Sequence, residues 1–159
     1  MLALAIAVLL SVIAMPTMLG TTELYQLRLA AEAVANEYRL AQSFARSQGI
    51  QVTITYWTQD GEISIYGEYA AGRQPLKERY KLPTGIRFDA AGDASLGFTA
   101  FRGTPVIAGG DPGAGFNAVL LLTSEDSKTN PGRVDRHGYV ITVAVNSGRV
   151  SIHTGSYIN

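Results

Sequence analysis

The 159-residue sequence contains no cysteine, and its two histidines and single tryptophan are its scarcest other residue types. The absence of cysteine excludes disulfides and thiolate metal sites, so a hydrophobic core must hold the fold without covalent help. Net charge is missing too, because 13 basic and 13 acidic side chains cancel. A neutral chain has no general attraction to nucleic acid or to anionic membrane surfaces.

Charged side chains are absent from residues 1–22, and the first one in the sequence is Glu23. A helix rises about 1.5 Å per residue, so this stretch reaches roughly 33 Å, enough to cross the roughly 30 Å hydrocarbon core of a bilayer. We therefore predict that residues 1–22 form the transmembrane half of an N-terminal helix. The alternatives are a cleaved signal peptide, which normally begins with basic residues that this run lacks, and a buried core helix, which needs a shorter apolar run.

Residues 23–49 continue this helix with an amphipathic pattern. No glycine or proline lies between Thr21 and Gln48, and Gly49 supplies a C-terminal stop. Apolar residues recur every three or four positions on one face, and charged residues occupy much of the remainder. The apolar face consists of Leu24, Leu27, Ala31, Val34, Tyr38, Ala41 and Ala45, and the charged residues are Glu23, Arg28, Glu32, Glu37, Arg39 and Arg46. We predict that the apolar face packs on a sheet.

Residues 50–159 change to the two-residue period of β-strands. The predicted strands are 50–57, 62–66, 76–82, 86–89, 96–101, 117–123, 138–145 and 150–153. Asp60-Gly61 and Ser147-Gly148 predict hairpin turns, because both accept the positive φ values that a tight turn needs. Residues 70–75 and 124–137 are predicted as loops, residues 154–159 as a tail or edge, and the apolar run 117–123 as a central strand. The sequence thus predicts an α+β fold, a long N-terminal helix packed on an antiparallel β domain at residues 50–159.

No group of residues in the sequence is typical of an enzyme. His137 and His153 have no carboxylates at metal-ligand spacing, and no serine lies in a nucleophile-elbow motif. The glycine-rich run 108–115 matches no phosphate-binding loop. We predict neither catalytic residues nor a cofactor.

The loop at residues 124–137 is rich in oxygen ligands and raises the question of calcium. A calcium loop needs acidic or amide side chains at alternate positions, but Lys128 stands between Asp126 and Asn130, where a ligand would belong. A solvated loop is the favoured interpretation, and no metal ligand is predicted.

One segment has a net basic charge and comprises Arg73, Lys77, Arg79, Lys81 and Arg87, with Glu78 among them. Three of these residues, Lys77, Arg79 and Lys81, fall on one face of the strand predicted at 76–82. Such a face could grip a nucleic-acid backbone, or it could be a solvated sheet face or a charged edge. We favour the second interpretation and predict no nucleic-acid partner, because no aromatic residue interleaves the basic face as a stacking platform.

Three stretches of the sequence carry a family resemblance. The apolar run 2–16, LALAIAVLLSVIAMP, is similar to the segment that follows the start of mature type IV pilins. Residues 27–56 resemble the helix-to-strand passage of the minor pseudopilin H and FimT-like family, including the Ala-Arg-Ser-x-x-Ile stretch at 45–50. Gly148-Arg149-Val150 is similar to that family's last hairpin. The chain therefore resembles a type IV pilin-like minor pseudopilin.

The resemblance implies a structural subunit, not an enzyme. In that family the helix anchors the subunit in the bacterial inner membrane as a single pass and packs with other pilin-like helices in a type II secretion pseudopilus. The sheet domain faces the periplasm or the cell surface, and the implied partners are other pilin-like subunits and secreted protein cargo. The alternative is a FimT-like minor pilin of a type IV pilus, used in pilus assembly or DNA uptake. Only Arg149 matches the basic C-terminal residues with which some of that family bind DNA.

The sequence departs from the family pattern at its start. The basic leader, the peptidase cleavage site and the acidic residue beside it, which accompany N-terminal methylation in the family, do not precede residues 1–22. We expect the chain as written to insert in a membrane but not to be processed or built into a filament.

Overall fold

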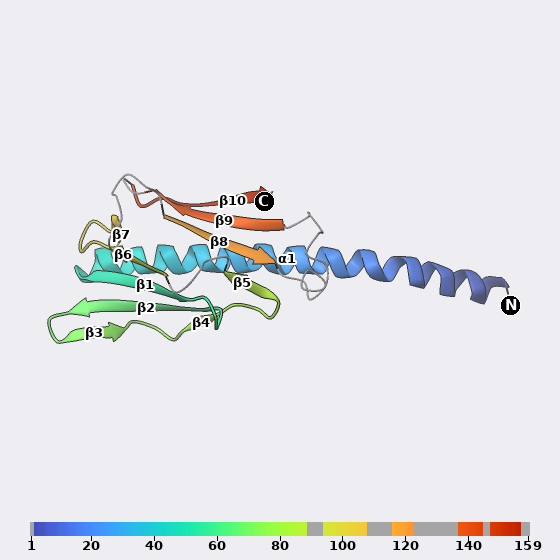
Figure 1. Cartoon of the computed structure of the whole chain (residues 1–159), viewed down its shortest axis with the longest axis horizontal. Helices are drawn as coiled ribbons and strands as arrows, with labels where there is room; N and C mark the ends of the chain where they lie inside the picture. The colour runs from blue at the N-terminus through green and yellow to red at the C-terminus, as the bar shows by residue number, and fades with distance from the viewer. Residues whose placement is uncertain (1, 89–93, 108–115, 123–136, 145–146, 157–159) are drawn as a thin grey trace.

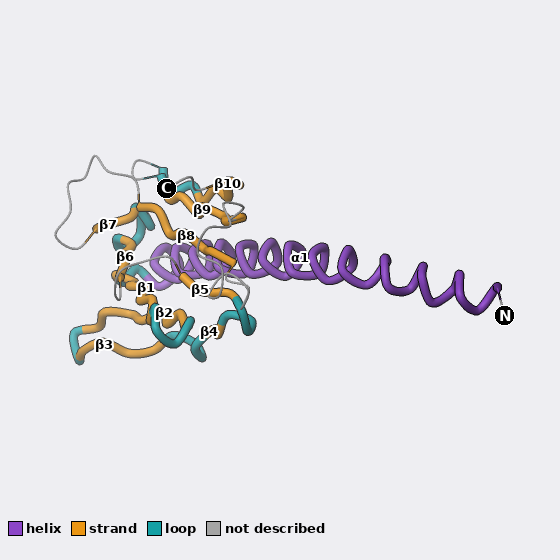
Figure 2. The backbone as a smooth tube through the Cα atoms, turned by 45° about the vertical axis from the view of Figure 1, so that its right-hand side comes forward, coloured by secondary structure: helices purple, strands orange, loops and turns teal. Residues whose placement is uncertain are grey.

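The computed structural model describes the backbone of residues 2–88, 94–107, 116–122, 137–144 and 147–156, and the side chains of residues 25–88, 95–106, 138–144 and 147–153. One helix, α1 (Leu2–Gln48), is 47 residues long. At about 1.5 Å per residue it reaches about 70 Å. Its C-terminal half is covered by strands, and its N-terminal part projects beyond them (Figures 1 and 2).

The strands form two antiparallel sheets, where the sequence predicted one. The larger sheet has the order β3-β2-β1-β6-β7, with β4 paired to β2. Its strands are β1 (Gln51–Trp57), β2 (Glu62–Tyr69), β3 (Gly72–Pro75), β4 (Tyr80–Lys81), β6 (Ala94–Phe98) and β7 (Pro105–Ile107). The smaller sheet has the order β10-β9-β8-β5 and is made of β5 (Ile86–Phe88), β8 (Phe116–Leu122), β9 (His137–Val143) and β10 (Val150–Ser156).

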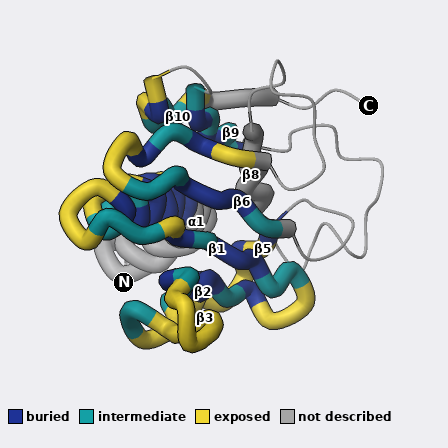
Figure 3. Tube along the Cα trace, turned by 90° about the vertical axis from the view of Figure 1, so that its left-hand side faces the viewer, coloured by how far each residue is buried: buried dark blue, intermediate teal, exposed yellow. Residues whose placement is uncertain are grey.

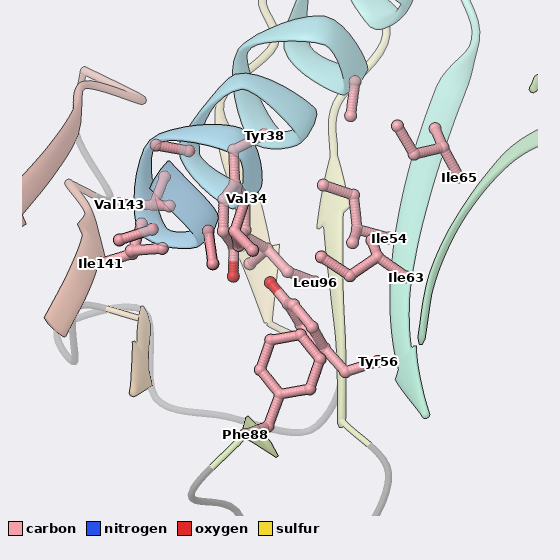
Figure 4. Packing of buried hydrophobic residues seen from close by; sticks show 14 of the residues in the cluster. Val34, Tyr38, Ile54, Tyr56, Ile63, Ile65, Phe88, Leu96, Ile141 and Val143 are labelled. Carbon is pink, nitrogen blue, oxygen red and sulfur yellow. The ribbon is translucent and has the colours of Figure 1, made fainter. Parts of the chain in front are cut away.

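Helix α1 lies between the two sheets and contacts strands of both (Figure 1). Val34 and Tyr38 project from it between Ile141 and Val143 of the smaller sheet and the isoleucines of β1 and β2 (Figure 4). All described members of the predicted apolar face are buried, which confirms that prediction: Leu27, Ala31, Val34, Tyr38, Ala41 and Ala45. Burial raises the pKa of the Tyr38 phenol well above its ordinary value.

The hairpin between β1 and β2 follows the sequence prediction. The register pairs Trp57 with Glu62 and Ile54 with Ile65. Gly61 in the turn has a φ of 65°. The smaller sheet confirms the central strand, since β8 pairs with β9 on one side and with β5 on the other. The predicted α+β architecture, a long helix packed on antiparallel strands, is therefore present.

Several predicted element boundaries are wrong. Residues 72–75 form β3 rather than a loop, and this strand escaped prediction because all four of its residues are exposed, so no alternation marks it. Only Tyr80–Lys81 of the predicted strand 76–82 is a strand. The strand predicted at 96–101 ends at Phe98, the three-residue β7 was missed, and β10 continues through residues 154–156 of the predicted tail.

The predicted membrane half of the helix stays a prediction. Residues 2–22 belong to α1, but their side chains lie outside the described residues. In the part of the chain that the structure describes, no helix is both long enough and apolar enough to cross a membrane.

Candidate interaction surfaces

Four of the five residues of the predicted basic segment form ion pairs. Arg73 lies 3.5 Å from Glu68, measured between Nε and Oε1, and its Nη2 donates to Thr55 Oγ1 at 2.7 Å. Arg79 and Lys81 both pair with Glu62, at 3.2 and 3.9 Å. The hydrogen bond to Glu62 raises the pKa of Arg79 above its ordinary value. Here the basic charge is met by carboxylates on the neighbouring strand.

Lys77 leaves the face that it was predicted to share with Arg79 and Lys81. Its Nζ donates to both carboxylate oxygens of Glu37 on α1, at 2.7 and 2.9 Å. The sequence placed Glu37 on the charged face of the helix, but this residue is buried. The alternation argument fails because residues 76–79 are not a strand, which frees Lys77 to reach the helix.

Tyr80 lies beside this ion pair at the start of β4. Burial, and then the charge of Glu37, raise the pKa of its phenol above the ordinary value of 10.0. The ion pair and the tyrosine together fix the 76–80 segment against α1.

Aromatic rings do accompany the basic segment, contrary to the sequence prediction. The guanidinium carbon of Arg73 lies 4.1 Å from the centre of the Tyr66 ring, and that of Arg79 lies 5.6 Å from the Trp57 ring. The rings come from β2 and β1, so the sequence of the basic segment alone could not reveal them. Each ring has an arginine at cation–π distance, so one face of each ring already contacts a cation.

A second group of cations gathers at the distal end of the molecule, where α1 ends. Arg46 of α1, Arg102 of the β6–β7 turn and Arg149 of the β9–β10 turn are all exposed. Within the described residues, no carboxylate lies at ion-pair distance from any of the three. Figure 3 views the molecule from this end.

Gln42 of α1 brings the two turns together. Its side-chain amide donates to the carbonyl of Gly103 at 2.9 Å and to that of Gly148 at 3.2 Å. Gly148 has a φ of 66°, and a Cβ there would collide with the Gln42 amide. Arg46 adds a third link, since its Nε donates to the carbonyl of Arg102 at 3.0 Å. One network therefore joins the helix end and the two turns that carry the three arginines.

Phe101 lies in the same place and has two unusual properties. Its side chain is 76% exposed, and its φ of 63° is the one positive value among the described non-glycine residues. The left-handed conformation costs a residue with a Cβ about 1–2 kcal/mol. It lets the Phe101 amide donate to the carbonyl of Ala45 at 3.1 Å, in the last turn of α1, and places the ring against Gly49. We call Arg46, Phe101, Arg102 and Arg149 the distal cap.

The face of α1 that turns away from the sheets is the third candidate surface. Tyr25 and Leu29 are 62% and 45% exposed and lie one helical turn apart. Arg28 and Glu32 form an exposed i,i+4 ion pair beside them at 3.1 Å. Two large apolar side chains on an exposed helix face, close to where α1 leaves the sheets, are typical of a contact with another helix.

Two solved structures of other proteins have a fold similar to that of this chain. The type IV minor pilin FimU of Pseudomonas aeruginosa PAO1 matches with a TM-score of 0.55 and 23% identity, over 84% of this chain and 92% of that chain. The minor pseudopilin EpsH of the Type 2 Secretion System of Vibrio cholerae matches with a TM-score of 0.54 and 11% identity, over 82% of this chain and 97% of that chain. The chain has a pilin-like fold. No protein-family profile and no curated protein sequence matches it.

The pilin-like fold brings together residues that the sequence analysis left apart. The residues of the distal cap come from the end of α1 and from two turns between strands. Arg46 and Arg102 are 56 residues apart in the sequence. One signal could have found it: each of the three arginines stands beside a turn, Arg46 in the last turn of the helix and the other two next to Gly103 and Gly148.

The remaining sequence candidates of this pilin-like chain give no site. His153 is exposed on β10, and the side chain of His137 lies outside the described residues, as do residues 108–115 and the calcium candidate within 124–137. Among the residues that the structure describes, no three histidine or acidic side chains gather where they could hold a metal. Arg87 is exposed on β5.

Proposed function

We propose that this chain is a structural minor subunit of a filament built from pilin-like helices. The observation that carries the proposal is α1 itself, which buries one face between two sheets and exposes Tyr25 and Leu29 on the other. The buried face stabilises the subunit, so the exposed apolar pair is available to a neighbour. Burial of such side chains against another helix contributes about 1.5–3 kcal/mol each.

The proposal includes an anchor and a location. Residues 1–22 carry no charge and continue into α1, so we propose that they form a single pass through the bacterial inner membrane, with residues 23–49 as the amphipathic half. Residues 50–159 would then lie in the periplasm or at the cell surface. Carbonate extraction tests the anchor, and recovery of the full chain in the soluble fraction contradicts it.

A type II secretion pseudopilus is the first candidate filament, with secreted protein as cargo. The fold shared with the minor pseudopilin EpsH supports it. A type IV pilus is the second candidate, and the higher identity to the minor pilin FimU supports that one. Gene deletion separates them, since a pseudopilin is needed for protein export into the medium, whereas a minor pilin is needed for pilus assembly or DNA uptake.

The filament role itself is tested on α1. Leu29→Lys puts a charge into the proposed helix contact and should remove the chain from sheared filaments without lowering its thermal stability. Val106→Lys is the matched control, because Val106 is 42% exposed and lies on β7. If both variants enter filaments as the unchanged chain does, the outward face of α1 is not the assembly surface.

A further inference from the structure

The distal cap holds positive charge that no carboxylate of the described residues meets at ion-pair distance. Glu68 of β2 is already engaged elsewhere, since it accepts from Thr53 at 3.1 Å and pairs with Arg73. The network around Gln42 thus joins the turns that carry Arg102 and Arg149 to the helix end that carries Arg46, and no described carboxylate lies at ion-pair distance from these three exposed arginines. Positive charge at one end of a molecule without carboxylate partners is complementary to an acidic surface on another molecule.

Phe101, which precedes Arg102 in the β6–β7 turn, adds an exposed apolar side chain to the cap. Backbone strain that a protein retains at an exposed position is typical of sites that clamp a partner. The ring cannot withdraw on its Gly49 side, because that glycine already lies in contact with it. Arginine and aromatic side chains are the types most enriched in the centres of protein–protein interfaces.

The position of the cap limits which partner can reach it. It lies at the opposite end of the molecule from the projecting part of α1 (Figure 1). In a filament built on parallel α1 helices, this end points along the axis toward the neighbour in that direction. This step rests on the proposed function.

We propose that the distal cap docks an acidic surface of another pilin-like subunit, with Phe101 buried at the centre of the contact and Arg46, Arg102 and Arg149 paired with its carboxylates. A nucleic acid fits the cap less well. Single-stranded nucleic acid binds through successive aromatic rings and many phosphate contacts, and the cap offers one ring and three arginines on a chain of zero net charge.

Site-directed photo-crosslinking in the cells that make the filament tests the proposal on the full-length chain. Phe101 is replaced by p-benzoylphenylalanine, and the same residue is placed at Leu29 and at Val106 in separate variants. We expect the Phe101 variant to give an adduct with a pilin-like subunit, mapped by mass spectrometry to a segment that contains several Asp or Glu residues. The Leu29 variant reports the helix contact, and the Val106 variant reports background.

Charge substitutions decide whether the arginines make the contact. In the Phe101 crosslinking variant, Arg102→Glu with Arg149→Glu should lower the adduct yield about tenfold, while Arg102→Lys with Arg149→Lys should keep most of it. Both arginines are exposed, so neither change should alter the melting temperature. An adduct at Leu29 without one at Phe101, or a Phe101 adduct insensitive to both changes, overturns the cap proposal and leaves the filament function standing.

A binding measurement tests whether the distal cap binds nucleic acid instead. The full chain in neutral detergent is titrated into a labelled single-stranded DNA of about 20 nucleotides and followed by anisotropy. We expect no saturable binding at physiological salt. Micromolar binding that is lost in the Arg102→Glu, Arg149→Glu variant assigns the cap to nucleic acid and overturns the proposal. Adducts at neither Phe101 nor Leu29 overturn both the cap contact and the filament function.

Discussion

Two regions of this molecule carry clustered positive charge, and they differ in how that charge is met. In the basic segment Arg73–Lys81, four cations close in sequence pair with carboxylates from β2 and α1. In the distal cap, three arginines far apart in sequence lie on a helix end and two turns that one network joins, and none pairs with a described carboxylate. The basic segment, which is continuous in the sequence, forms ion pairs within the fold. The arginines of the distal cap, which are scattered in the sequence, are exposed.

The difference shows why counting charges along a chain is a poor guide to binding. An ion pair within the molecule satisfies both groups and leaves little field for a partner. In the described part of the chain, no neighbouring strand supplies a carboxylate to the arginines of the distal cap, so their positive charge is available to a partner. The predictions below test whether the two regions divide structural and binding roles in this way.

The largest effect is expected at Lys77. Lys77→Met leaves the buried Glu37 carboxylate without its cation and should lower the free energy of unfolding by about 2 kcal/mol, less than for a fully buried pair because Lys77 is partly exposed. Arg79→Met, which breaks an exposed pair, is the control and should cost much less. Thermal unfolding of the full chain in neutral detergent measures both. Equal melting temperatures would mean that the basic segment is not structural.

Gln42 should give the next largest effect, because it holds the distal cap together. Gln42→Leu removes two hydrogen bonds to backbone carbonyls and should cost about 1–2 kcal/mol. Hydrogen exchange at residues 101–104 and 147–150 should accelerate at the same time. Gln48→Leu is the control, because Gln48 accepts one exposed hydrogen bond from Tyr69. Unchanged exchange in the Gln42 variant would show that the turns hold each other without the amide.

A smaller effect is expected in alkaline solution. The pKa of Tyr80 is raised in the folded chain by burial and by Glu37. A raised pKa means that the stability contribution is fully present below the unfolded-state value near 10.0 and is lost as pH rises through the folded-state value.

Tyr80→Phe should therefore flatten the fall of the urea midpoint above pH 10. The slope keeps a part that comes from Tyr38, whose pKa is raised as well. Tyr25→Phe, at an exposed position, should leave the slope as it is. A Tyr80→Phe variant that loses stability with pH as steeply as the unchanged chain would contradict the assignment.

The smallest effect on stability is expected at Phe101. Phe101→Gly removes a ring that is 76% exposed and relieves the left-handed backbone, so the urea midpoint should stay the same or rise slightly. The same variant should lose docking at the distal cap. A fall in stability as large as that of Lys77→Met would mean that the ring over Gly49 holds the fold rather than a partner.

The sequence predicted the elements in which buried and exposed residues alternate with a regular period. The helical period of the Leu27–Ala45 face and the alternation in β1 and β2 both reflect burial on one side, and burial forces a regular pattern. β3 was missed because all four of its residues are exposed, and β7 was missed because three residues are too few to show a period. The division into two sheets was equally hidden, since strand order depends on contacts between distant segments.

The candidate surfaces were predicted less well, for a related reason. A charge run such as Lys77, Arg79 and Lys81 is visible along the sequence, but its partners Glu37 and Glu62 are not identified by spacing. Arg102 and Arg149 looked like ordinary turn residues until the Gln42 amide joined their turns. Only the exposed pair Tyr25 and Leu29 could be placed opposite the buried face by helical geometry alone.

The hydrogen bonds of Gln42 also make the distal cap depend on two turns that lie far apart in the sequence. The hydrogen bonds span 61 and 106 residues, and contacts of such sequence separation form late in folding because they close long loops. A chain that is still emerging during synthesis, or is cut before Gly148, can form α1 and the β1–β2 hairpin but lacks the second turn of the cap. The cap is therefore complete only when both turns have formed, and a partner that binds there would select subunits in which they have.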